Sequence, residues 1–259
     1  MMNISIIGLG SVGNAAFTIL QNYHSVSGYD IDGRGSWENV ISSEVAFVCV
    51  STDAGLNGQL DVSNVFDVAK KLFEDKYEGV MLVKSTLHPG TMDTIASNYP
   101  TLNISYVPEF LREKDAIEWF ANPDRIVYST DEKSEEKTLE CFEWVPTHVP
   151  RIKMKHLEAE FGKLAHNAYI ATKVTFTCEI ERIANMRNID AHAIMEAVWT
   201  DRRIKNSAHL IPGLGGYGGK CVPKDTAALA SEDPDLDSLF HQLNERGGEE
   251  SVKLRRTKK

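Results

Sequence analysis

Cys221 lies where a cysteine can act as a nucleophile. It ends a glycine-rich loop, PGLGGYGGKC at 212–221, and precedes a segment expected to begin a helix. The helix dipole and the cations of Lys220 and Lys224 favour the thiolate, which is the reactive form of the side chain. Asp225 is expected one helical turn away, where it could position water or an attacking group. The sequence therefore predicts covalent chemistry at Cys221, and the alternative is a buried structural cysteine.

A second group of polar side chains lies on a long helix expected from residue 157 to about residue 186. Glu160, Lys163 and Asn167 are spaced by three and four residues, so they share one stripe of the helix beside its apolar face. A lysine and an asparagine placed there can hold a substrate hydroxyl and stabilise an alkoxide as a hydride leaves. The alternative is a solvated polar stripe without a chemical role.

A dinucleotide fingerprint lies at the start of the chain. Its motif GLGSVG, at 8–13, follows a predicted strand and precedes a predicted helix. There the glycines allow a tight turn and a close approach to a pyrophosphate, which the helix N-terminus stabilises. Asp30 closes the second predicted strand, where a carboxylate accepts hydrogen bonds from the adenosine ribose. Asp30 would repel a 2′-phosphate, so NAD is favoured over NADP, although Arg34 lies nearby. The predicted cofactor contacts here are Gly8, Gly10, Ser11, Val12, Gly13 and Asp30.

Two further polar segments follow predicted strands. They are VSTD at 50–53, with Ser51 and Thr52, and VKST at 83–86, with Thr86. Ligands of open α/β sheets bind at the carboxyl edge, where both segments are expected. For Ser51 and Thr52 the alternative is ordinary helix capping.

The elements that must position these residues alternate along the first 150 residues. Runs of β-branched residues predict strands at 4–8, 25–30, 45–50, 79–84, 103–107 and 125–129. The alternation with helical stretches predicts an α/β fold, a Rossmann-type doubly wound parallel sheet, over residues 1–150. Residues 151–259 are expected to form an all-helical domain for catalysis and dimerisation. An extended helix with apolar residues on more than one face needs a partner, so we expect a homodimer.

Composition narrows the classes of partner. A formal net charge of −9 argues against binding to nucleic acid. The four cysteines are widely spaced, so neither a disulfide framework nor a metal site is predicted, and a reducing compartment is expected. No apolar run reaches the length of a membrane span, which predicts a soluble, cytoplasmic protein.

Six ordered motifs resemble the UDP-glucose and GDP-mannose 6-dehydrogenases. They are GLGSVG at 8–13, YDID at 29–32, VKSTLHPGT at 83–91, VPEFLRE with NPDRIV at 107–127, EFGKLAHNA at 160–168 and PGLGGYGGKCVPKD at 212–225. The resemblance implies a four-electron oxidation of a nucleotide sugar by NAD, with UDP-glucose the foremost candidate. The C6 alcohol becomes an aldehyde, a cysteine captures it as a thiohemiacetal, a second oxidation gives a thioester, and water releases the uronate.

The resemblance also implies roles for individual residues. Cys221 matches the nucleophile, and Lys163 and Asn167 match the pair that binds the C6 oxygen. The residues matched to water activation and thioester hydrolysis are Asp225, Thr86 and Glu109. Those expected at the sugar nucleotide are Glu109, Phe110, Leu111, Lys163, Asn167, Tyr217, Gly218 and Arg203, the last reaching across a dimer interface. Lys224 matches a position near NAD, and Ser51, Thr52 and Thr86, at the carboxyl edge of the sheet, are also expected to contact the cofactor.

The chain departs from this family at two places. Full-length relatives carry a third, C-terminal Rossmann-like domain, which we expect this shortened form to lack. A second shortening lies between Asp30 and Val45. The chain could therefore be a compact enzyme, half of a split enzyme with a separate nucleotide-binding partner, or a truncated, non-catalytic NAD-binding subunit. A two-electron dehydrogenase of the β-hydroxyacid or 6-phosphogluconate type is the other enzyme class, and Cys221 argues against it because those enzymes need no cysteine.

Overall fold

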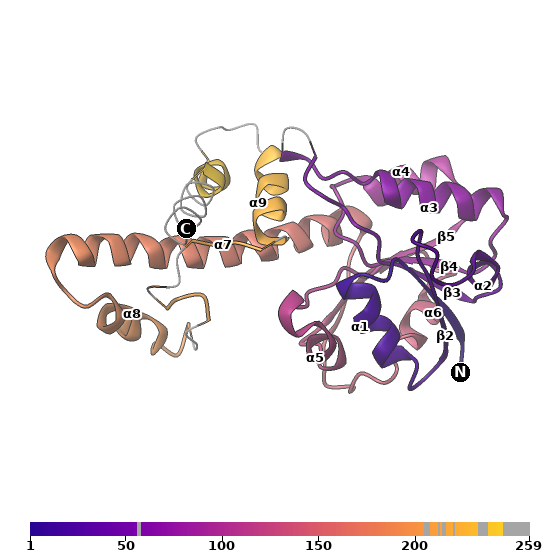
Figure 1. Ribbon diagram of the computed structural model, residues 1–259, viewed down its shortest axis with the longest axis horizontal. Coiled ribbons are helices and arrows are strands. Elements are labelled where there is room, and N and C mark those ends of the chain that lie inside the picture. Colours follow the sequence, from indigo (N-terminus) through magenta and orange to yellow (C-terminus); the bar gives the residue numbers. More distant parts are fainter. Residues whose placement is uncertain are drawn as a thin grey trace. The chain divides into compact units, whose positions relative to one another are not determined.

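Figure 1 shows the fold of the chain in a computed structural model. The structure describes residues 1–55, 58–204, 208–211, 213, 216–219, 221–232 and 238–245. The chain forms two compact units: unit 1 comprises Met1–Asp53 and Leu60–Lys163, and unit 2 comprises Ala54–Gln59 and Leu164–Lys259.

Unit 1 is built on a seven-stranded sheet whose strand order is β2-β1-β3-β4-β5-β6-β7. The strands are β1 (Asn3–Ile7), β2 (Ser25–Tyr29), β3 (Val45–Val48), β4 (Val80–Val83), β5 (Asn103–Tyr106), β6 (Ile126–Thr130) and β7 (Arg151–Lys153). All neighbouring strands are parallel except β5 and β6. Because β1 pairs with both β2 and β3, the strand order reverses beside β1, and doubly wound sheets bind ligands at the carboxyl edge of such a switch point.

Helices cover both faces of this sheet (Figure 1). They are α1 (Ser11–Leu20), α2 (Trp37–Ile41), α3 (Ser63–Glu74), α4 (Thr91–Asn98), the short 3-10 helix η2 (Glu113–Asp115), α5 (Ala116–Ala121) and α6 (Glu135–Glu140). In β3, Ala46 and Val48 join the core beneath α3 and α4, whereas Val45 and Phe47 join the core beneath α1 and α5. Successive strand residues point to opposite faces, so a strand buried on both faces is a continuous apolar run.

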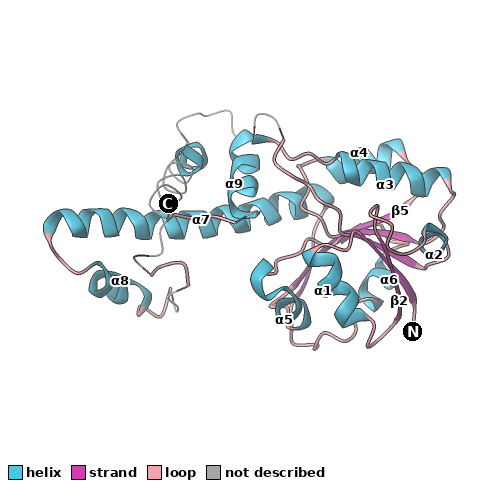
Figure 2. Ribbon diagram, viewed as in Figure 1, coloured by secondary structure: helices cyan, strands magenta, loops and turns pink. Residues whose placement is uncertain are grey.

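The named elements of unit 2 are helical, and strands are drawn only in unit 1 (Figure 2). They are the long α7 (His156–Arg187), which begins in unit 1, α8 (Ala191–Trp199) and α9 (Cys221–Ser231). Asp190 caps α8 by accepting hydrogen bonds from the backbone N–H groups of His192 and Ala193.

These findings confirm the predicted Rossmann-type sheet followed by a helical region, and all six predicted strands are present. The short strand β7 was not predicted, and within the predicted parallel sheet β6 runs antiparallel to β5. The chain between β5 and β6 contains only η2 and the six-residue α5. It enters β6 from the carboxyl edge of β5 instead of crossing the sheet. Residues 107–125 therefore leave and return at the edge expected to bind ligands.

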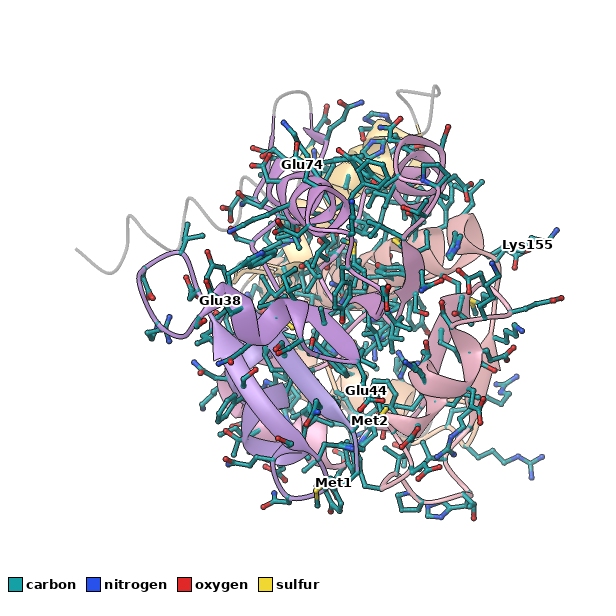
Figure 3. All side chains as sticks on the ribbon, turned by 90° about the vertical axis from the view of Figure 1, so that its right-hand side faces the viewer. Met1, Met2, Glu38, Glu44, Glu74 and Lys155 are labelled. Atoms are coloured by element: carbon teal, nitrogen blue, oxygen red, sulfur yellow. The ribbon has the colours of Figure 1, made fainter. Side chains whose placement is uncertain are left out.

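The opposite, amino-terminal edge carries none of the predicted site residues. Met2 and Glu44 lie there (Figure 3), and the carboxylate of Glu44 accepts the backbone N–H of Asn3 at 3.1 Å. The predicted boundary at residue 150 falls just before β7, whereas the two compact units divide within α7, after Lys163.

Candidate functional site

The loop between β1 and α1 has the geometry that a bound pyrophosphate requires. Gly8 has a φ of +87°, and a Cβ built on Gly13 would lie 1.9 Å from the Gly8 carbonyl oxygen. A Cβ built on Gly10 meets no atom within 4 Å, which leaves open space beside the helix N-terminus. Gly10 is the N-cap of α1 and no side chain caps that end. The backbone N–H groups of the first turn, from Ser11 to Gly13, can therefore face an anion.

Asp30 lies at the end of β2, as the fingerprint requires. Its Oδ2 accepts the backbone N–H of Leu9 at 2.7 Å, which ties the glycine loop to the second strand. Arg34 contacts the same oxygen at 3.3 Å and also binds Asp32 at 2.8 Å. The open space at Gly10, the uncapped helix and the carboxylate at Asp30 together fit a dinucleotide with a free ribose 2′-hydroxyl.

The other residues predicted at the cofactor follow β3 and β4. Ser51 is exposed, and its hydroxyl accepts a hydrogen bond from Asn64 at 3.2 Å. Thr52 is buried and Thr86 is half-buried. All three lie in unit 1 beyond the carboxyl ends of their strands, where the sequence analysis placed them.

A buried ion pair joins the carboxyl ends of β4 and β5. Lys84 Nζ lies 3.0 Å from Glu109 Oε2, and the two side chains are 3% and 14% exposed. The other carboxylate oxygen of Glu109 accepts the backbone N–H of Phe110 at 2.9 Å. The ammonium of Lys84 also contacts the rings of Phe120 and Phe142. Glu109, predicted to assist thioester hydrolysis, is thus held at both oxygens.

The aromatic ring of Phe110 contacts two cationic side chains. Lys163 Nζ lies 5.2 Å from the centre of its ring, and the guanidinium carbon of Arg125 lies 4.2 Å from it. Lys163 is itself 6% exposed. Since Phe110 and Leu111 line a hollow with Glu109, three residues predicted to meet the substrate lie together in unit 1.

Glu160 anchors the start of α7. Its side chain is fully buried, and its two oxygens accept the backbone N–H groups of Gly90 and Met92 at 2.7 and 2.8 Å. It therefore caps the N-terminus of α4, beyond the loop that carries Thr86. Burial raises the pKa of Glu160 to about 7, although both hydrogen bonds favour the charged form.

A second polar cluster lies in unit 2. Asn167 Nδ2 donates to Asp225 Oδ2 at 2.5 Å, and Lys224 Nζ lies 2.7 Å from Asp225 Oδ1. Asp225 is fully buried and Asn167 is 5% exposed. Cys221 is the first residue of α9 and is exposed, one helical turn before Asp225. The expected spacing of cysteine and carboxylate is therefore present, and Lys220 lies outside the described residues.

The burial of the polar side chains on α7 rules out the alternative that they form a solvated stripe. Because Glu160, Lys163 and Asn167 are 0%, 6% and 5% exposed, they do not form a solvated polar stripe. Buried polar groups need partners, and those of Glu160 and Asn167 are the α4 N-terminus and Asp225.

The contacts of the remaining three predicted substrate residues are as follows. Tyr217 is 5% exposed, and its hydroxyl donates to the Leu243 carbonyl at 2.6 Å. Gly218 is exposed. Arg203 is exposed and pairs with Asp201 at 2.6 Å.

Comparison with known proteins decides the family. Residues 35–145 match the NAD binding domain of the UDP-glucose/GDP-mannose dehydrogenase family, and residues 157–245 match its central domain. The chain belongs to this family. NAD is therefore the cofactor of the N-terminal domain. This agrees with the open space at Gly10 and the carboxylate of Asp30, which fit a dinucleotide.

Two relatives show how much of the family this chain represents. It is 31% identical to a UDP-glucose 6-dehydrogenase of Bacillus subtilis, over 93% of this chain and 64% of that protein. A UDP-glucose dehydrogenase from Pyrobaculum islandicum superposes with a TM-score of 0.83 at 28% identity, over 95% of this chain and 68% of that one. The chain thus spans roughly two thirds of their length.

A third comparison concerns the other enzyme class. A 3-hydroxyisobutyrate dehydrogenase from Mycobacterium tuberculosis superposes with a TM-score of 0.71 at 14% identity, over 96% of this chain and 93% of that one. At this identity the likeness shows the fold alone.

The structure adds three residues to this family member's candidate site. Lys84 and Arg125 had been quoted inside motifs without a role, and Glu160 had been named only as a member of the polar stripe with Lys163 and Asn167. A glutamate between two apolar residues was the available signal for Glu160, and a lysine that ends an apolar strand was the signal for Lys84, but the partners of both are distant in sequence. Among the described residues, no cluster of His, Cys, Asp and Glu could hold a metal ion. No helix in the described part of the chain has the length and apolar character that crossing a bilayer requires.

Proposed function

We propose that this chain oxidises a nucleotide sugar at C6 to the uronate, with UDP-glucose as the first substrate to test. The observation that carries the proposal is the pairing of buried Asn167 with buried Asp225, one helical turn from exposed Cys221. Lys163 lies one turn before Asn167 on α7. A hydride-transfer enzyme without a covalent step needs no cysteine at that position.

In the first oxidation the chain's own residues hold the C6 hydroxyl. The ammonium of Lys163 and the amide of Asn167 stabilise the alkoxide that forms as the hydride leaves. NAD supplies the hydride acceptor for both oxidations, so that R–CH2OH, two NAD⁺ and water give R–COO⁻, two NADH and three H⁺. Asp225 keeps Asn167 in place, because the amide N–H is already directed by a carboxylate that cannot move into solvent.

In the second oxidation Cys221 retains the aldehyde. Its sulfur adds to the carbonyl carbon and the oxygen takes a proton, which gives a thiohemiacetal. Loss of the second hydride together with that hydroxyl proton turns the thiohemiacetal into a thioester. Attack by water then breaks the C–S bond and returns the thiol. Glu109 is suited to accept a proton from that water because Lys84 and the Phe110 backbone fix the orientation of its carboxylate.

The second candidate is a two-electron hydroxyacid dehydrogenase. Its two-domain architecture fits the fold that this chain shares with the 3-hydroxyisobutyrate dehydrogenase, a likeness of fold alone. That candidate gives no role to Cys221, and the family assignment favours the nucleotide-sugar reaction.

The test counts NADH formed per sugar consumed, with UDP-glucose, GDP-mannose and 6-phosphogluconate in turn. Two NADH per sugar, lost in Cys221→Ser while NAD still binds, supports the four-electron route. One NADH, unaffected by Cys221→Ser, supports the two-electron candidate. No turnover despite NAD binding supports a non-catalytic subunit or a requirement for a separate nucleotide-binding partner.

We further propose that unit 2 forms a homodimer through α7. Tyr169, Phe176 and Ile183 recur every seven residues and are 64%, 48% and 46% exposed, and Met186 extends the stripe at 71%. An apolar stripe with this repeat packs against a second helix. Light scattering should give twice the mass of one chain, falling to one chain in Phe176→Glu. A single-chain mass for the unaltered protein at working concentration would contradict the dimer.

A further inference from the structure

Arg125 lines two adjoining hollows at the carboxyl edge of unit 1. One hollow reaches inward to Lys84, and the other opens toward Leu111 and Trp119. The residues that line both are Glu109, Phe110, Pro123 and Arg125. Arg125 is half-buried, so its charge faces these hollows with only part of its surface in contact with solvent.

The guanidinium of Arg125 lies over the aromatic ring of Phe110. Its central carbon lies 4.2 Å from the centre of the Phe110 ring. Within the described part of the chain, this ring contact is the interaction that the Arg125 side chain makes. Among the described residues, no carboxylate lies within ion-pair distance of Arg125 and no hydrogen bond from it is present. Because the donors of a guanidinium lie in its plane, contact with a ring leaves that fork able to bind a planar or tetrahedral oxyanion.

The neighbouring charges do not cancel that of Arg125. Glu109 lines both hollows, but its carboxylate is paired with Lys84 at 3.0 Å. Asp124 lines the outer hollow and is exposed, and it also makes no ion pair with Arg125 within the described part of the chain. In a protein of net charge −9, a half-buried cation whose donor edge makes no hydrogen bond to the described residues is suited to bind an anion.

Phe110 relates this cation to the proposed chemistry. The same ring contacts Lys163 Nζ at 5.2 Å, so Lys163 and Arg125 lie one aromatic ring apart. Lys163, which the proposed function places at the C6 oxygen, and Arg125 therefore share one aromatic neighbour.

We propose that Arg125 is an oxyanion-binding residue of the substrate hollow, taking either the sugar-linked phosphate of the substrate or the carboxylate of the product. Phe110 presents the guanidinium, and the Lys84–Glu109 pair keeps Glu109 from occupying it. The proposal rests on the proposed function for the identity of the ligand, although its test measures binding and needs no turnover.

The experiment is calorimetric titration of the full chain with glucose 1-phosphate, glucuronate and glucose. The variants are Arg125→Met, which removes the charge at similar length, and Arg125→Lys, which keeps the charge without the fork. Arg112→Met is the matched control, because Arg112 is an exposed arginine of the same segment paired with Asp115. NAD titration shows whether each variant retains a folded unit 1.

The unaltered chain should bind at least one of the two anions about tenfold or more tightly than glucose, the effect of one charge-assisted pair. Arg125→Met should lower the affinity for that anion to the affinity for glucose. Arg125→Lys should retain part of the preference for the anion, and Arg112→Met should retain all of it. The preferred anion identifies the phosphate or the carboxylate as the natural group. Equal affinity for all three sugars in the unaltered chain, or an anion preference that survives in folded Arg125→Met, overturns the proposal. Absence of NADH production would overturn the proposed function and leave this binding result unaffected.

Discussion

Glu160→Gln tests which force controls the buried carboxylate at the start of α7. Two backbone N–H groups, of Gly90 and Met92, favour the charged form, whereas complete burial and the nearby Asp93 disfavour it. Burial is the largest effect, and it raises the pKa from the ordinary value of 4.5 to about 7. The folded chain is therefore less stable, relative to the unfolded chain, when Glu160 is ionised.

The sign of the pH dependence follows from this shift. Below pH 4.5 Glu160 is protonated in both the folded and the unfolded chain, and above pH 7 it is ionised in both. Between these values the folded chain binds more protons, so the contribution of Glu160 to stability decreases as the pH rises. The change in unfolding free energy between pH 5 and pH 8 is about 2.5 kcal/mol at 1.36 kcal/mol per pKa unit.

The assay is urea unfolding of the unaltered chain and of Glu160→Gln at pH 5, 6, 7 and 8. Glutamine does not titrate, so the difference between the two proteins isolates Glu160 from the other carboxylates. We expect the unfolding free energy of Glu160→Gln to rise by about 2.5 kcal/mol relative to that of the unaltered chain as the pH goes from 5 to 8. Glu158→Gln, an exposed change on the same helix, is the control for the loss of one charge. Stability curves of the unaltered chain and Glu160→Gln that run parallel with pH would refute the reasoning, because the two N–H bonds would then outweigh burial.

Two further substitutions test the other polar contacts. Lys84→Met leaves Glu109 without its cation and should lower the unfolding free energy by about 3 kcal/mol; adding Glu109→Gln should recover much of this loss, and additive losses would show that the pair is not coupled. Gly10→Ala should leave the melting temperature nearly unchanged but weaken NAD binding at least about tenfold, since its Cβ fills the space a phosphate would approach. Gly13→Ala is the matched opposite, because its Cβ would meet the Gly8 carbonyl oxygen at 1.9 Å and should destabilise the fold itself; unimpaired NAD binding by Gly10→Ala would contradict the assignment of the loop.

Local patterns in the sequence were sufficient for the six strands and for residue pairs on one helix. Val45–Val48 is a continuous apolar run and is buried on both faces, so its assignment needed no knowledge of its neighbours. The spacing of Lys163 and Asn167, and of Cys221 and Asp225, likewise follows from helical periodicity. In contrast, β7 has three residues, two of them exposed, and carries no alternation that could distinguish a strand from a loop.

Contacts between distant segments were beyond the reach of these patterns. Lys84 and Glu109 are 25 residues apart, and they meet because β4 and β5 are adjacent and parallel, so that their carboxyl ends lie side by side. Nothing near Lys84 indicates that partner. The Asn167–Asp225 hydrogen bond joins residues 58 apart and depends on the packing of α9 against α7 in unit 2. Neither pair could be assigned without the topology.

Glu160, Asp225 and the half-buried Glu109 differ in what compensates the charge of the carboxylate, and this difference separates a structural role from a chemical one. Glu160 is opposed by backbone N–H groups, which are fixed dipoles and cannot be exchanged for substrate. Glu109 and Asp225 are opposed by lysines, whose ammonium groups can reorient when a substrate or water arrives. Substitution of Glu160 should therefore change stability and its pH dependence without changing catalysis, whereas substitution of Glu109 or Asp225 should impair catalysis as well as stability. A change in turnover without a change in stability for Glu160→Gln would place that residue in the chemistry and contradict this division.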